Sequence, residues 1–138
     1  MRNPGSTPSR PKLSVERVVT ALLLIAPAAH AGDPARGRAL LADRQASQCV
    51  LCHAVPGTPA HLQGDLAPDL RGVGTRLTPD EIRLRLVDPA RSNPDTIMPS
   101  YARRDGFTNP GRAFHDRPIL SDAAIDDVVA YLATLTEE

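Results

Sequence analysis

The chain contains two cysteines, Cys49 and Cys52, which are separated by two residues and followed directly by His53. Two thiols one helical turn apart can each add across one of the two vinyl groups on an edge of a porphyrin, and the next residue can then place its imidazole under the iron. C-x-x-C-H is therefore the attachment signature of a c-type haem. We predict one covalent haem c, bound through Cys49 and Cys52, with His53 as an axial ligand of the iron.

Other uses of a C-x-x-C sequence need a context that this chain lacks. A thiol oxidoreductase site follows a strand and opens a helix in a βαβ unit, but no β-rich segment precedes Cys49. A zinc site needs two more ligands, and neither His61 nor His115 completes a second C-x-x-C or an H-x₃₋₅-H pair. The haem interpretation therefore stands.

Met98 is the candidate for the second axial ligand. It is the only methionine after residue 31 and lies between Pro94 and Pro99, which restrict the backbone around it. His/Met ligation is typical of electron-transfer haems, although a lone methionine can also fill a gap in a core. The rival ligands are His61 and His115, which are better explained as exposed, titrating imidazoles.

Pro68 is a candidate support for His53. A ligating histidine usually donates its second N–H to a carbonyl or carboxylate, which fixes the ring. The backbone carbonyl of Pro68, fifteen residues after His53, offers such an acceptor. The alternative is an ordinary proline-containing turn.

The first 31 residues have the pattern of a secretory signal peptide. Basic residues precede a mostly apolar run over residues 18–29, and Ala29-His30-Ala31 forms a small-x-small cleavage site. The run is shorter than the roughly 20 apolar residues of a membrane span and contains Pro27, although a retained anchor is the alternative. We expect cleavage after Ala31, export from the cytoplasm and one domain over residues 32–138.

Composition excludes one class of function and supports a cofactor. Residues 32–138 contain 12 Arg, no Lys and 15 acidic residues, a formal charge of −3, so nucleic-acid binding has no electrostatic support. The whole chain has four Phe and Tyr residues and no Trp. A domain this small has little bulk for a core, so we expect a bound group to fill the interior.

Three helices are predicted, and no alternating apolar pattern indicates a sheet. The first has Asp33 as N-cap and Pro34 at its first position, and runs to about Ala46. The second opens with a capping box at Thr78–Glu81 and ends before Pro89. The third is capped by Ser121, and its apolar residues recur at helical spacing to Leu135.

The order of these features resembles the class I cytochrome c fold: an all-α, small helical domain wrapped around one covalently bound haem. In this resemblance Gly37 is the small residue that lets the first and last helices cross closely. Leu41 and Tyr131 would be its packing neighbours.

More specific segments resemble the SoxX family, the monohaem c-type cytochrome subunits of SoxAX complexes of thiosulfate oxidation. The resemblance spans nearly all of residues 32–138 and is carried by these stretches: Gln63-Gly64-Asp65 with Pro68, Gly72-Val73-Gly74, residues 82–89, Asn93–Tyr101, Arg117–Leu120 and Asp127–Leu132. Two departures are Ala67, where the family commonly has Gly, and Asp116-Arg117, where it has Gly or Lys. They affect the turn before Pro68 and a possible docking loop, and leave the iron ligands intact.

This resemblance implies a periplasmic subunit that accepts electrons and is itself non-catalytic. In that family the complex acts as an L-cysteine S-thiosulfotransferase, which oxidatively couples thiosulfate to a cysteine of the SoxYZ carrier. The catalytic thiolate belongs to the partner, a SoxA-like monohaem or dihaem cytochrome, and a downstream acceptor takes the electrons. The alternatives are a free-standing monohaem electron shuttle and, if Met98 dissociates readily, a haem gas sensor.

The segment from Pro99 to Pro118 is a candidate docking loop. It has a local charge of +2 on an acidic domain, and Phe107 and Phe114 are interleaved with its four arginines. Arginine and aromatic residues are enriched at interfaces. The alternative is a solvated loop whose two rings pack on the haem.

Overall fold

The computed structural model describes residues 31–109 and 111–137. The predicted signal peptide lies outside the described residues, apart from Ala31. Every regular element in the described ranges is a helix, which confirms the all-α prediction. The longer elements are α2 (Pro34–Ala42), α3 (Val73–Arg76), α4 (Pro79–Val87), α5 (Pro89–Ser92) and α6 (Asp122–Thr134), and the single 3₁₀ turns are η1 (Cys49–Leu51), η2 (Ala60–Leu62) and η3 (Arg112–Phe114).

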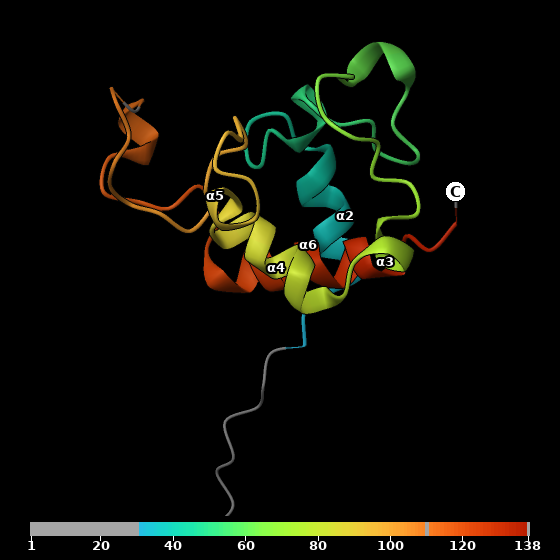
Figure 1. The fold of residues 1–138 in the computed structure, drawn as a ribbon. Helices are drawn as coiled ribbons and strands as arrows, with labels where there is room; N and C mark the ends of the chain where they lie inside the picture. The colour runs from blue at the N-terminus through green and yellow to red at the C-terminus, as the bar shows by residue number, and fades with distance from the viewer. Residues whose placement is uncertain (1–30, 110, 138) are drawn as a thin grey trace, which may run out of the picture.

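Helices α2 and α6 cross at close range and form the centre of the molecule (Figure 1). Gly37 of α2 faces the α6 backbone, and a Cβ added there would collide with the Asp127 carbonyl and lie 2.8 Å from Cβ of Tyr131. Leu41, one turn further along α2, is fully buried. The predicted crossing, with its packing neighbours, is therefore confirmed.

A buried carboxylate joins the same two helices. Asp127 accepts a hydrogen bond from the Asp33 backbone N–H at 2.7 Å and two from the Arg36 guanidinium at 2.8 and 2.9 Å. A bidentate Arg–carboxylate pair is geometrically specific. The pair therefore fixes the angle at which the first turn of α2 meets α6.

The prediction that the first helix runs to about Ala46 is wrong, because α2 ends at Ala42. The Asp43 carboxylate accepts hydrogen bonds from the backbone N–H groups of Gln45 and Ala46, at 2.8 and 2.9 Å. Such a side chain offers the backbone an alternative to the helical ladder. The same two hydrogen bonds lower the pKa of the Asp43 carboxyl.

Helix α4 begins and ends as predicted. Its capping box is complete, with the Thr78 hydroxyl accepting from the Glu81 N–H and the Glu81 carboxylate accepting from the Thr78 N–H. It ends at Val87, and Pro89 then opens the short α5, which the sequence pattern did not indicate. Arg83 pairs with Asp126 of α6, so α4 is also tied to the central crossing.

The core combines these helices with the segment that contains the two cysteines. Its fully buried members include Leu41, Ile125 and Val128 from the helices and Val50 from η1. Within residues 31–109 and 111–137, none of the helices has the length and apolar content that a membrane crossing requires.

Replacing Gly37 by Ala is expected to lower the free energy of unfolding by about 1–3 kcal/mol, the usual cost of overpacking. Denaturant unfolding measures this loss. Gly111→Ala is the matched control, because an added Cβ there would meet only a Phe114 ring carbon at 3.9 Å, and it should stay within about 0.5 kcal/mol of wild type. Equal effects of both substitutions would contradict the close crossing.

Candidate functional site

One tight turn presents both thiols. Cys49 starts η1, and the backbone N–H groups of Cys52 and His53 both donate to the Cys49 carbonyl, at 3.2 and 3.0 Å. Both thiols are free. Cys49 is buried, and this burial raises the pKa of its thiol, whereas Cys52 is half-buried. The two sulfurs and the following imidazole therefore come from one compact stretch of backbone.

The imidazole of His53 is held by the carbonyl of Pro68. Nδ1 lies 2.6 Å from that oxygen. A carbonyl can only accept, so Nδ1 carries a proton, and in the neutral imidazole Nε2 is then the unprotonated nitrogen, the form that binds a metal. The predicted support of His53 by Pro68 is confirmed, and the alternative of an unrelated turn is wrong.

The chain around Pro68 is aligned along the cysteine motif by backbone hydrogen bonds. Three N–H groups of this stretch donate to alternate carbonyls of the motif segment: Gly64 to Val50 at 2.7 Å, Ala67 to Cys52 at 2.8 Å and Leu70 to Ala54 at 3.0 Å. A side chain at Gly64 would collide with the Leu51 carbonyl. The approach of the two segments therefore depends on glycine at that position.

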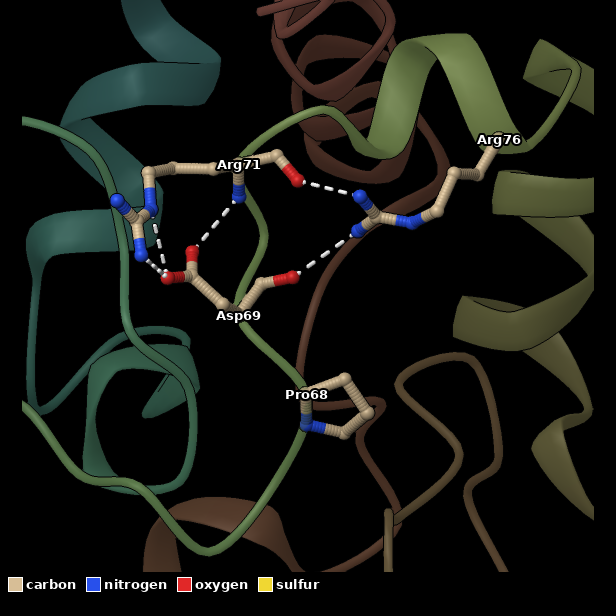
Figure 2. Close-up of a pocket in the computed structure, with 4 residues that line it drawn as sticks. All are labelled: Pro68, Asp69, Arg71 and Arg76. Atoms are coloured by element: carbon tan, nitrogen blue, oxygen red, sulfur yellow. Dashed lines mark hydrogen bonds and ion pairs between the residues drawn. The ribbon is translucent and has the colours of Figure 1, made fainter. Parts of the chain in front are cut away.

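Arg76 stabilises the turn that follows Pro68 (Figure 2). Arg76 of α3 donates to the carbonyls of Arg71 and Asp69, at 2.7 and 3.0 Å. The Arg71 side chain is hydrogen-bonded to the Asp69 carboxylate, which lowers the pKa of that carboxyl. These groups line an open cleft of about 410 Å³. Sequence reasoning did not single out Arg76, because its partners are backbone atoms.

Met98 lies in a loop that is anchored just after it. The Met98 N–H donates to the Thr96 hydroxyl at 3.1 Å, and its side chain packs half-buried against the core. Just beyond it, the Tyr101 N–H donates to the Leu86 carbonyl of α4 at 2.8 Å, and the Tyr101 carbonyl accepts from Leu120 at 3.0 Å. The loop therefore has a fixed path on α4.

A side-chain contact joins this loop to the cysteine motif. The hydroxyl oxygen of Tyr101 lies 3.6 Å from the sulfur of Cys49. Both residues are buried. The structure thus brings the segment of Met98 to the segment of Cys49 and His53, although Tyr101 lies 52 positions after Cys49 in the sequence.

The two rival histidines lie on the surface. His61 is exposed on η2, and His115 is exposed at the end of η3. Their surface positions agree with the expectation of exposed imidazoles.

The donor set fits a c-type haem. It comprises two free thiols on one turn, an imidazole with its Nδ1 engaged and its Nε2 open, and a thioether in an anchored loop. Large apolar side chains are also exposed in the segments that carry these groups: Leu51 at 42%, Leu62 at 42%, Leu66 at 69% and Ile97 at 75%. Such surface suits residues that pack against a large apolar group.

The chain is similar to proteins of known family and structure. A family model described as Cytochrome c matches residues 34–136. Among solved structures, the chain is similar to one described as the crystal structure of SoxXA from P. pantotrophus, with 33% sequence identity and a TM-score of 0.69. The match covers 77% of this chain and 83% of that chain. No curated protein sequence matches it.

Met98→Ala in the haem-loaded protein is expected to abolish the sulfur-to-iron charge-transfer absorption, because it removes the only methionine among the described residues. Absorption spectroscopy of the oxidised protein measures this. Ile97→Ala is the control, since its side chain is 75% exposed and adjacent in sequence, and it should keep the band.

The opposite result would assign the ligand elsewhere. If the wild-type protein shows no sulfur band, and His61→Ala or His115→Ala changes the spectrum, a histidine holds the second axial position.

Proposed function

Because the chain belongs to the cytochrome c family and is a SoxX-like class I cytochrome, we propose that it is the electron-accepting subunit of a SoxXA complex. The observation that carries this proposal is the similarity to SoxXA, which extends over 83% of the matched chain at 33% identity. The partner is then a SoxA-like cytochrome that forms a heterodimer with it.

Several described residues have separate roles in binding the haem. Cys49 and Cys52 attach it covalently, and His53 and Met98 ligate the iron, with His53 oriented by Pro68. When bound, the haem supplies a one-electron redox centre whose potential His/Met ligation raises. With His53 and Met98 both serving as ligands, the bound haem would exchange electrons without a change of protein ligands, and the site would offer no position for substrate.

In the proposed reaction, the new S–S bond is formed on the partner. Coupling thiosulfate to a carrier cysteine forms an S–S bond and releases one proton and two electrons. This chain contributes no nucleophile, because both its thiols are used for haem attachment. It accepts one electron at a time, so the second leaves through another centre of the complex or in a later transfer to the downstream acceptor.

The setting of this reaction is the periplasm. The SoxYZ carrier presents the substrate cysteine there, and the signal peptide directs the chain to that compartment and is cleaved behind Ala31. The export pattern of the sequence and the haem c of the family support this location.

The segment from Pro99 to Pro118 is the proposed contact with the partner. Residues 102–109 and 111–118 of this segment extend away from the helices as the orange loop on the left of Figure 1. Its arginines, Arg103, Arg104, Arg112 and Arg117, are exposed, and Phe107 and Phe114 are half-buried among them. Arg103 is paired loosely with Asp105, at 3.9 Å with both side chains exposed. An acidic surface on the partner would complement this loop.

A tagged chain purified from cells grown on thiosulfate is expected to elute with a second cytochrome in fixed ratio. Spectroscopy and mass spectrometry of the eluate identify that partner. Elution of this chain alone, with a stable His/Met spectrum, would support the free-standing electron shuttle.

Changing Arg103 and Arg104 together to Glu is expected to raise the Kd for the SoxA-like partner about tenfold, or 1.4 kcal/mol, because it reverses the charge of the loop. Calorimetry or surface binding at fixed salt measures the affinity. The control is Arg38→Glu with Arg91→Glu, an equal charge change at exposed positions outside the loop. If both double variants bind alike, the loop is not the docking site.

A further inference from the structure

Tyr101 is the side chain that connects the two halves of the candidate haem site. Its hydroxyl oxygen lies 3.6 Å from the sulfur of Cys49, and only two residues separate it from Met98 in the sequence. We propose that Tyr101 is a positioning residue, which keeps Met98 at the iron by donating a hydrogen bond to the sulfur of Cys49. This inference rests on the proposed attachment at Cys49 and ligation by Met98.

The backbone of Tyr101 makes it a short tether for Met98. Its N–H is bonded to the Leu86 carbonyl and its carbonyl to the Leu120 N–H, at 2.8 and 3.0 Å. Three residues of extended chain span at most about 10–11 Å. Movement of Met98 away from the iron is therefore limited as long as Tyr101 stays in place, and becomes easier when Tyr101 is released.

The direction of the hydrogen bond follows from the chemistry of attachment. A free thiol at Cys49 can donate or accept, but a thioether has no S–H and can only accept. The Tyr101 O–H is then the donor. Tyr101 is 5% exposed, and its burial raises the pKa of the phenol, so the hydroxyl keeps its proton.

The other polar neighbour of the Cys49 sulfur is Ser47. Its carbonyl, at 3.8 Å, can only accept, and its hydroxyl donates to the Leu40 carbonyl at 2.6 Å, so neither replaces the phenol as a donor. Cys49 is 7% exposed, so water does not readily replace the phenol as a donor to its sulfur. Among the described residues, the hydrogen-bond partner of the Tyr101 hydroxyl is Cys49. Removing the hydroxyl therefore removes one restraint between the two segments while leaving the ring packed in the core.

The expected effect is on the fraction of molecules in which Met98 has left the iron. Loss of one buried hydrogen bond should raise this fraction about fivefold, which corresponds to about 1 kcal/mol. A ligand that can bind only after Met98 leaves has an apparent affinity proportional to that fraction. Imidazole is such a ligand and is small enough to report on a local opening.

The experiment compares the oxidised, haem-loaded wild-type protein with Tyr101→Phe in an imidazole titration. Loss of the sulfur-to-iron absorption gives the apparent affinity, which should increase about fivefold in the variant. Tyr131→Phe is the matched control, because Tyr131 is also a buried tyrosine, 8% exposed, but lies on α6. It should bind imidazole as the wild type does.

Two outcomes would overturn the proposal. An unchanged affinity in Tyr101→Phe, or an equal increase in both variants, would show that the hydroxyl has no specific role in holding Met98. Absence of the sulfur band in the wild type would overturn the ligand assignment, and this inference with it. The test uses the isolated haem-loaded protein, so it is independent of whether the SoxA-like partner is found.

Discussion

The hydrogen bond from the His53 imidazole to the Pro68 carbonyl fixes the side chain around which the rest of the site is arranged. Outer partners of this kind commonly change metal affinity or activity by about 10–100-fold when they are lost. Here the acceptor is a backbone atom, so its position depends on the path of the chain and not on one side chain. That path is set by the hydrogen bonds that align residues 64–70 with the cysteine motif and by Arg76, which binds two carbonyls just beyond Pro68.

The helices provide the frame on which these loops are fixed. The crossing of α2 and α6 depends on the absence of a side chain at Gly37 and on the bidentate pair between Arg36 and Asp127. Helix α4 is attached to the same frame through Arg83, and its last turn holds the loop of Met98 through Tyr101. A domain with few aromatic side chains thus orders its loops with specific hydrogen bonds, and leaves apolar residues such as Leu66 and Ile97 exposed beside the site.

The parts of this structure that depend on local rules could be predicted from the sequence. The capping box at Thr78 and Glu81, the cap at Ser121 and the C-x-x-C-H motif each act within a few residues. The end of α2 could not be placed, because the Asp43 side chain competes with the helix for nearby N–H groups.

Long-range contacts were harder to predict for a different reason. The partner of Pro68 was suggested by the chemistry of a ligating histidine. The contact of Tyr101 with Cys49 and the binding of Arg76 to backbone carbonyls follow from the path of the chain, and no residue pattern signals them. That Met98, and not His61 or His115, is the second ligand is still a prediction, which the sulfur-to-iron absorption tests.

We propose that this chain accepts electrons from thiosulfate coupling in a complex with a SoxA-like partner. Rapid mixing of the reconstituted complex with thiosulfate and the SoxYZ carrier, followed at the haem absorption of this chain, tests it most directly. We expect reduction that requires all three components: the partner, the carrier and thiosulfate. Reduction at the same rate without the SoxA-like partner, or no reduction in the complete mixture, would contradict it.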